Sequence, residues 1–175
     1  MNDLLDQAWD LLTRGVQDRT LSSNRPTLAT TGPKLRTVVL RAASRTTQTL
    51  DIHSDARAGK IAQLRRDPHA ALHVWDADAS LQIRIRARAE LHIDDDEAHQ
   101  AFAALPEHGR RIYTAVAQAG ATIPLPDAVT FDGPTHFALI RLHLSEIELL
   151  HLSRDLHRRA VFTAEQCWTG RWLAP

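Results

Sequence analysis

The chain has 175 residues, and its 21 lysine and arginine residues are balanced by 21 aspartate and glutamate residues. This length suits one domain with a sizeable core, and the zero net charge gives no basic field that would favour nucleic acid or an anionic membrane as a partner. The single cysteine, Cys167, has no partner for an internal disulfide, and no apolar run reaches membrane-spanning length, so a soluble, cytoplasmic protein is predicted.

The first 17 residues are predicted to form an amphipathic helix. Leu4, Ala8 and Leu12 recur there at helical spacing, and Asn2 or Asp3 is available as the N-terminal cap. Residues 20–25 then form a polar connector.

Short β-rich segments follow, separated by turn signals. Gly32-Pro33 marks the first turn, a polar loop joins the next two segments as in a hairpin, and Asp67-Pro68 ends a helix. The predicted elements are strands over residues 26–31, 35–42 and 48–54, a helix over residues 56–66, and strands over residues 69–75 and 81–93.

The second half of the chain is predicted to open with a helical insertion over residues 94–119. Asp94, Asp95 and Asp96 are interpreted as charge that complements a helix dipole rather than as a metal cluster, and a second helix is expected over residues 108–119. A long loop rich in proline and glycine follows over residues 120–134 and suggests a binding role or a flap. Four closing strands are predicted over residues 135–144, 146–151, 158–163 and 168–173.

This order of elements predicts one mainly β domain over residues 1–175. An antiparallel barrel of about seven or eight strands with appended helices is the natural solution, because closure removes exposed strand edges. The closing strands occupy residues 135–175. The ten histidines form no helical zinc-binding motif, so no metal site is predicted.

Basic and hydroxyl side chains gather between residues 36 and 60. Arg36 and Arg41 bracket one strand, a second strand ends at His53 and Ser54, and a helix begins shortly afterwards. A helix N-terminus offers unpaired N–H donors, and arginine binds phosphate oxygens in pairs. The stretch therefore predicts a phosphate site that includes Lys60, although on pattern alone Lys60 is equally well a surface lysine.

Four segments, in this order, resemble motifs of the pyridoxamine 5'-phosphate oxidase-like family, the FMN-binding split barrels. The first two are Arg36-Thr37-Val38-Val39-Leu40-Arg41, similar to the R-x-V-x-L-K/R strand, and His53-Ser54 with Gly59-Lys60, similar to the pairs that hold the phosphate and ribityl chain. The others are Leu81-Gln82-Ile83-Arg84-Ile85, similar to R-Q-V-R-I, and the C-terminal stretches at residues 156–159 and 168–175, similar to R-L-H-D-R and W-x-x-x-R-L-x-P.

The resemblance implies an FMN-dependent oxidoreductase that passes a hydride from a small molecule to FMN and then to oxygen or another acceptor. It implies a homodimer with FMN at the subunit interface, and it makes Arg41 and His157 candidates for substrate contact. No side chain is assigned as a general base. The cofactor-binding positions it implies are Arg36, Thr37, Val38, Val39, Leu40, Arg41, His53, Ser54, Gly59, Lys60, Gln82 and Arg159.

Several positions depart from the family pattern, mostly on the substrate side. Asp155 stands where the R-L-H ending has its arginine, and the glutamine–serine pair falls on Ala119-Gly120. Gly59 replaces the first basic residue of the R-K pair, and Arg57 is the nearby candidate to compensate for it. The expected tyrosine–arginine–serine substrate set is not reproduced. The substrate therefore need not be a form of vitamin B6.

Two other readings stay open. The first is a flavin-binding carrier, sensor or stress protein without turnover, which would use the same FMN residues. The second is a barrel without flavin that binds nucleic acid or a small molecule through the row Arg84, Arg86 and Arg88. That row has no exposed aromatic residues between its arginines for base stacking, so solvated arginines explain it better.

Overall fold

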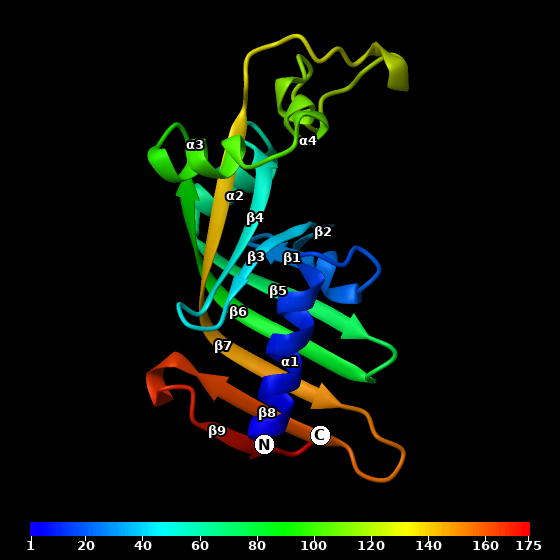
Figure 1. The fold of residues 1–175 in the computed structure, drawn as a ribbon, viewed down its shortest axis with the longest axis vertical. Coiled ribbons are helices and arrows are strands. Elements are labelled where there is room, and N and C mark those ends of the chain that lie inside the picture. The colour runs from blue at the N-terminus through cyan, green and yellow to red at the C-terminus, as the bar shows by residue number, and fades with distance from the viewer.

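The computed structural model describes residues 1–175 and shows a curled antiparallel sheet with helices packed around it (Figure 1). The helices are α1 (Asn2–Gly15), α2 (Gly59–Arg66), α3 (Asp96–Ala103) and α4 (Glu107–Arg111), with short 3-10 turns η1 (Ser22–Asn24), η2 (Ile112–Thr114), η3 (Pro126–Ala128) and η4 (Ala164–Gln166). The strands are β1 (Thr27–Thr30), β2 (Lys34–Thr37), β3 (Leu40–Ser44), β4 (Thr49–Asp55), β5 (His69–Asp76), β6 (Leu81–His92), β7 (Phe137–His151), β8 (Arg158–Thr163) and β9 (Gly170–Leu173).

Seven strands follow one another across the sheet in the order β2-β1-β5-β6-β7-β4-β3, and β8 and β9 extend it from the far half of β7. The two strands at the ends of this order, β2 and β3, are consecutive in the chain. Only Val38 and Val39 separate them, a link that spans at most about 11 Å. The sheet must therefore curl until its two ends meet, which confirms the predicted antiparallel barrel.

The predicted strand over residues 35–42 is wrong in one respect, because it is two strands. The pairing of β2 with β1 ends next to Val38, whose N–H still donates to the carbonyl of Pro26 at 3.0 Å. Two residues later, Leu40 pairs with Ile52 at the other end of the sheet. The alternating pattern continues through the break, since Val38 and Leu40 are both buried.

The closing strands show the opposite error. Residues 135–144 and 146–151 were expected as two strands, but they form the single strand β7. Ser145 is an extra residue at a register shift, because Arg86 pairs with Glu146 and Ala87 pairs with Leu144. The bulge bends the strand without ending it, so β7 pairs β4 with its first half and β8 with its second.

The helical insertion ends earlier than expected. Asp95 caps α3 by accepting a hydrogen bond from the N–H of Ala98 at 2.9 Å, which confirms the reading of the acidic triplet as helix-end charge. The second helix stops at η2, so regular structure ends at Thr114 rather than at residue 119. Residues 115–136 form a long connection whose only helical turn is η3.

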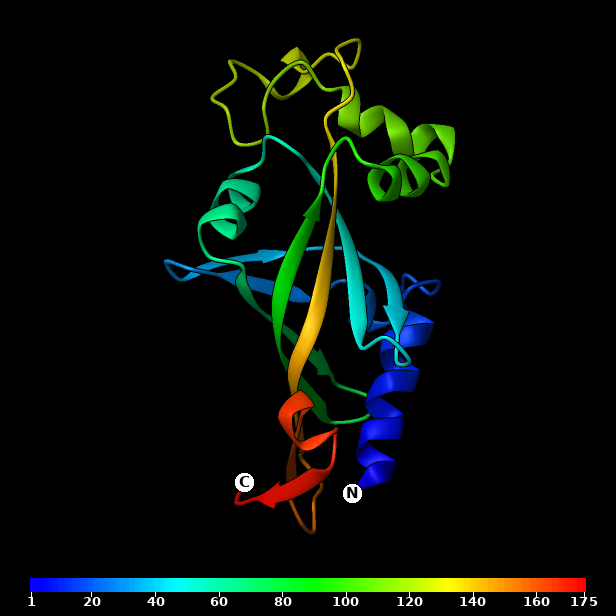
Figure 2. The same cartoon turned by 90° about the vertical axis from the view of Figure 1, so that its left-hand side faces the viewer.

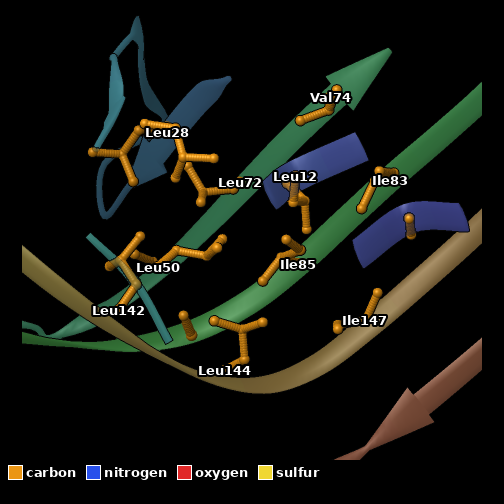
Figure 3. Packing of buried hydrophobic residues seen from close by; sticks show 14 of the residues in the cluster. Leu12, Leu28, Leu50, Leu72, Val74, Ile83, Ile85, Leu142, Leu144 and Ile147 are labelled. Atoms are coloured by element: carbon orange, nitrogen blue, oxygen red, sulfur yellow. The ribbon is translucent and has the colours of Figure 1, made fainter. Parts of the chain in front are cut away.

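The main core lies between α1 and the concave face of the sheet (Figure 2). Apolar residues of α1, among them Leu4 and Leu12, are almost fully buried, and each such leucine contributes roughly 2 kcal/mol of hydrophobic stabilisation. In Figure 3 Leu12 lies beside strand β6, which carries both Ile83 and Ile85. No helix in the fold has the length and apolar character needed to cross a membrane.

Candidate functional site

A cluster of cations and hydroxyl groups lies where α2 meets β1, β2 and β4. The Lys60 ammonium donates to the Ser54 hydroxyl at 2.9 Å. Nearby, the Arg36 guanidinium donates to Thr30 Oγ1 at 2.7 Å and to Gln63 Oε1 at 2.9 Å. The fold thus brings together Arg36, Ser54 and Lys60, three of the residues expected at a phosphate.

No carboxylate neutralises this pair of cations, since neither Arg36 nor Lys60 forms an ion pair and both are only partly exposed. Burial, and then the positive charge of Arg36, lower the pKa of Lys60, while Asp55 partly offsets this effect. Burial also lowers the pKa of Arg36. Two cations held close together without a counter-charge are the arrangement expected of an anion site.

The N-terminus of α2 adds backbone donors beside the same cluster. Ala58 is the cap residue and no side chain caps the helix, so the N–H groups of Gly59 and Lys60 remain available, while that of Ile61 donates to the carbonyl of Ala58 at 2.9 Å. Gly59, the first helical residue, faces open space, because a Cβ built there meets no atom within 4 Å. A helix N-terminus with free donors favours negative charge.

Thr30 and Gln63 complete the cluster and were not expected from the sequence. Thr30 Oγ1 donates to Gln63 Oε1 at 2.6 Å, so the two side chains form one network that orients Arg36. A threonine on a strand and a glutamine on a helix carry no local signal, because their contact depends on how α2 packs against β1.

Arg57, the residue suggested as a substitute for the missing basic residue at Gly59, is engaged by other partners. Its guanidinium donates to Asp55 Oδ2 at 2.7 Å and to the carbonyl of Ala115 at 2.8 Å. These partners fix Arg57 against the long connection before β7. In this arrangement Arg57 is thus held away from the cluster that Arg36 and Lys60 form.

Arg41 and His53 lie together beside α3, on the other face of β4. His53 and Ser54 are neighbours in a strand, so their side chains point to opposite faces, and Ser54 is buried while His53 is partly exposed. The ring of His53 meets the edge of Phe137 with centroids 4.8 Å apart. Burial, and then the charge of Arg41, lower the pKa of His53 to about 4.

The segment between Arg36 and Arg41 connects these two places. The side chains of Val38 and Leu40 are buried in the core, so only their backbone groups could reach a ligand, while Thr37 is exposed and Val39 is half-buried.

Gln82 and Arg159 lie elsewhere, on the outer face of the sheet. Gln82 pairs with Leu150, and Leu150 pairs with Arg159, so the three residues form one row across β6, β7 and β8. Arg159 Nε donates to Glu148 Oε1 at 2.9 Å, and Arg84 donates to Glu148 Oε2 at 2.6 Å. Burial raises the pKa of Glu148, but the hydrogen bonds from Arg159 and Arg84 outweigh this effect and lower the pKa overall.

His157 is exposed in the loop before β8 and is not brought to any of the other predicted residues by a hydrogen bond or ion pair. The site residues therefore fall into three groups: Arg36, Ser54 and Lys60 beside α2; Arg41 and His53 beside α3; and Gln82 and Arg159 on the outer face.

Comparison with known proteins identifies the family. The family model for the pyridoxamine 5'-phosphate oxidase FMN-binding domain matches residues 6–93. The chain belongs to this family. The match spans α1 to β6 and includes the clusters beside Arg36 and Arg41. No curated protein sequence gives a significant match.

Solved structures share the fold of this pyridoxamine 5'-phosphate oxidase-like chain. A pyridoxamine 5'-phosphate oxidase-related, FMN-binding protein from Nostoc punctiforme is 20% identical with a TM-score of 0.77, over 97% of this chain and 96% of that one. PhzG from Burkholderia lata, solved with tetrahydrophenazine-1-carboxylic acid, is 16% identical with a TM-score of 0.73, over 99% and 90%. A protein from Clostridium acetobutylicum related to general stress protein 26 is 9% identical with a TM-score of 0.60, over 95% and 98%. At these identities the likeness shows the fold alone, and it confirms the split barrel.

The cluster beside α2 fits the phosphate of FMN. A phosphate monoester carries close to two negative charges and accepts hydrogen bonds at three oxygens. Arg36 and Lys60 supply two uncompensated cations, Ser54 supplies a hydroxyl, and α2 supplies free N–H groups. The donor set therefore matches the group that the family model names.

Proposed function

We propose that this protein is an FMN-dependent oxidoreductase that acts on a small molecule. The observation that carries the proposal is the pair of unneutralised, partly buried cations, Arg36 and Lys60, beside the uncapped N-terminus of α2. Such a pair costs stability unless an anion binds there. The single cysteine suits a reducing compartment, so the proposal includes a cytoplasmic location.

The chain's own residues would bind and orient. Arg36, Lys60 and Ser54 would hold the phosphate, and Arg41 and His157 would contact the substrate. Gln82 would offer its amide to the polar edge of the ring, because an amide can both donate and accept hydrogen bonds. The chemistry supplied by bound FMN is two-electron oxidation, in which a hydride leaves the substrate and the electrons pass to oxygen or another acceptor.

We also propose that the working unit is a homodimer with FMN between the subunits. In one chain Arg36 lies on the face of the sheet toward the core and α2, whereas Gln82 and Arg159 lie on the outer face. One chain therefore cannot bring both groups to a single small ligand. Apolar side chains on the same outer face, Leu35 at 70% exposure and Trp75 at 43%, support its role as a contact surface.

The first test is the visible absorption spectrum of the purified protein, before and after it is mixed with FMN and desalted. Retained flavin absorption is the expected result. A colourless protein that cannot be loaded would mean that the cluster beside α2 does not hold FMN, and the proposed function would fail.

The same preparation separates an oxidoreductase from a flavin-binding protein without turnover. The flavin is reduced anaerobically, and its reoxidation is followed with oxygen alone and with candidate acceptors; candidate amines and nicotinamide cofactors are then tried as donors. Turnover with any donor supports the oxidoreductase. Retained flavin that no donor reduces supports a carrier, sensor or stress protein, the alternative that the departures at Asp155 and at residues 119–120 favour.

A further inference from the structure

A cavity of about 440 Å³ lies between β3, β4, β7 and α3, separate from the cluster beside α2. Its walls combine apolar and charged groups. The apolar side chains include Ala101, Ala104, Leu105 and Leu139, and the charged ones are two arginines and two carboxylates. A cavity that combines apolar side chains with a few placed charged groups is a common form of small-molecule site.

The two arginines of this cavity differ in their partners. Arg141 donates to both oxygens of Asp51 at 3.1 Å and to Glu97 at 3.0 Å. These bonds, to Asp51 first, raise the pKa of Arg141. Both carboxylates of the cavity are thus committed to one guanidinium.

Arg41, by contrast, has no carboxylate partner. Its Nε is buried without a hydrogen-bond partner, and so is Nδ1 of the neighbouring His53. Burying an unpaired charged donor costs several kcal/mol unless a ligand satisfies it. His53 is neutral at physiological pH and adds no charge, so the cavity offers one free cation.

We propose that this cavity binds the substrate of the flavoenzyme through a single carboxylate held by Arg41, with an apolar ring or chain against Leu105 and Leu139. This inference rests on the proposed function and names its substrate class. The positive charges of Arg41 and Arg141 equal in number the negative charges of Asp51 and Glu97. The cavity is therefore neutral when empty, and a bound monoanion gives it a net charge of minus one. A phosphate ester brings close to two charges and would face the two carboxylates without a second free cation.

The test compares benzoate with phenyl phosphate, which share a phenyl ring and differ in charge and anion shape. Each probe is titrated into the FMN-loaded protein and the FMN-free protein, with calorimetry for affinity and the visible flavin spectrum as a second readout. We expect benzoate to bind at least about tenfold more tightly than phenyl phosphate. Tighter binding of phenyl phosphate would overturn the assignment.

Two variants locate the carboxylate. Arg41→Met keeps much of the length of the side chain and removes its charge. We expect this variant to bind benzoate at least about tenfold more weakly than the parent. Arg154→Met, in an exposed loop, is the matched control. Glu97→Gln removes one of the two negative charges of the cavity and is expected to improve phenyl phosphate binding more than benzoate binding. Benzoate binding that survives Arg41→Met would overturn the proposal, and thermal unfolding checks that each variant is folded.

The result separates this inference from the proposed function. If the protein retains FMN but does not bind benzoate, the proposed carboxylate site is wrong and the proposed flavoprotein function stands. If the protein retains no FMN but binds benzoate in a manner that depends on Arg41, the carboxylate site stands and the proposed oxidoreductase function is wrong.

Discussion

Lys60 and Arg36 place positive charge where the fold gains little from it. Neither pairs with a carboxylate, and the pKa of Lys60 is lowered by burial and by Arg36 itself. Removing such a charge should cost the fold almost nothing. Each side chain therefore serves a ligand more than it serves the core.

At this scale we predict that Lys60→Ala and Arg36→Ala each weaken FMN binding about 10-fold to 100-fold, the effect of losing one charge-assisted hydrogen bond. The melting temperature without FMN should stay close to that of the parent. Binding is measured by quenching of FMN fluorescence, with Arg65→Ala on the exposed side of α2 as control. If both variants bind FMN as tightly as the parent, the phosphate site lies elsewhere.

His53 makes stability depend on pH. Burial first, and then the charge of Arg41, lower its pKa from 6.5 to about 4, while Asp51 opposes the shift. Between these values the unfolded chain takes up a proton that the folded chain does not. The free energy of unfolding therefore falls as the pH drops through this window and is recovered above it.

We expect His53→Phe to lose about 2 kcal/mol less stability than the parent when the pH is lowered from about 7 to about 4.5. Urea unfolding at the two pH values measures this difference, and comparing the two proteins removes the contribution of carboxylates such as Asp67, whose pKa is also lowered. His108→Phe, at an exposed position, should behave like the parent. Equal acid losses in the parent and in His53→Phe would contradict the prediction.

Among the elements, the long connection over residues 115–136 is joined to the start of α2 through Arg57. The guanidinium donates to the carbonyls of Ala115 at 2.8 Å and Val116 at 3.2 Å, and the Gln118 amide donates to the carbonyl of Arg57 at 2.8 Å. Asp55 holds Arg57 in this position with a further hydrogen bond at 2.7 Å. The connection is thus anchored beside the proposed phosphate site, two residues from Gly59.

We predict that Arg57→Ala loosens this connection while the barrel stays folded, because the guanidinium bonds that hold the connection reach only the carbonyls of Ala115 and Val116. Limited proteolysis should cut within residues 115–136 several times faster than in the parent. Arg110→Ala, on the exposed side of α4, should leave the rate unchanged. Unchanged cleavage in Arg57→Ala would show that other contacts hold the connection.

Most elements could be predicted from the sequence because their periodicity is local. The alternation in β6 and the helical spacing in α1 follow directly from which face is buried. The break at Val38 and the bulge at Ser145 could not be predicted, because they depend on which strand lies alongside. For the same reason Arg36, Ser54 and Lys60 could be placed near one ligand, but their neighbours Thr30 and Gln63 could not.

At the scale of the whole molecule, the two faces of the sheet carry different parts of the proposed flavin site. Arg36 and Lys60 lie beside α2, and Gln82 and Arg159 lie on the outer face in one row with Leu150. If a complete site needs one part from each subunit, defects in the two parts should complement each other. Two chains that are each defective in one part can then form one intact site between them.

The last prediction uses this property of a symmetric dimer. The double variants Arg36→Ala/Lys60→Ala and Gln82→Ala/Arg159→Ala should each retain little FMN alone; in the second, Glu148 keeps Arg84 as its partner. When the two are unfolded together and refolded in equal amounts, half of the dimers are mixed. Each mixed dimer has one intact site of two, so about a quarter of the parental FMN content should return. FMN content after desalting and the mass from light scattering measure the outcome. No recovery in a protein shown to form mixed dimers would mean that each FMN is bound by a single chain.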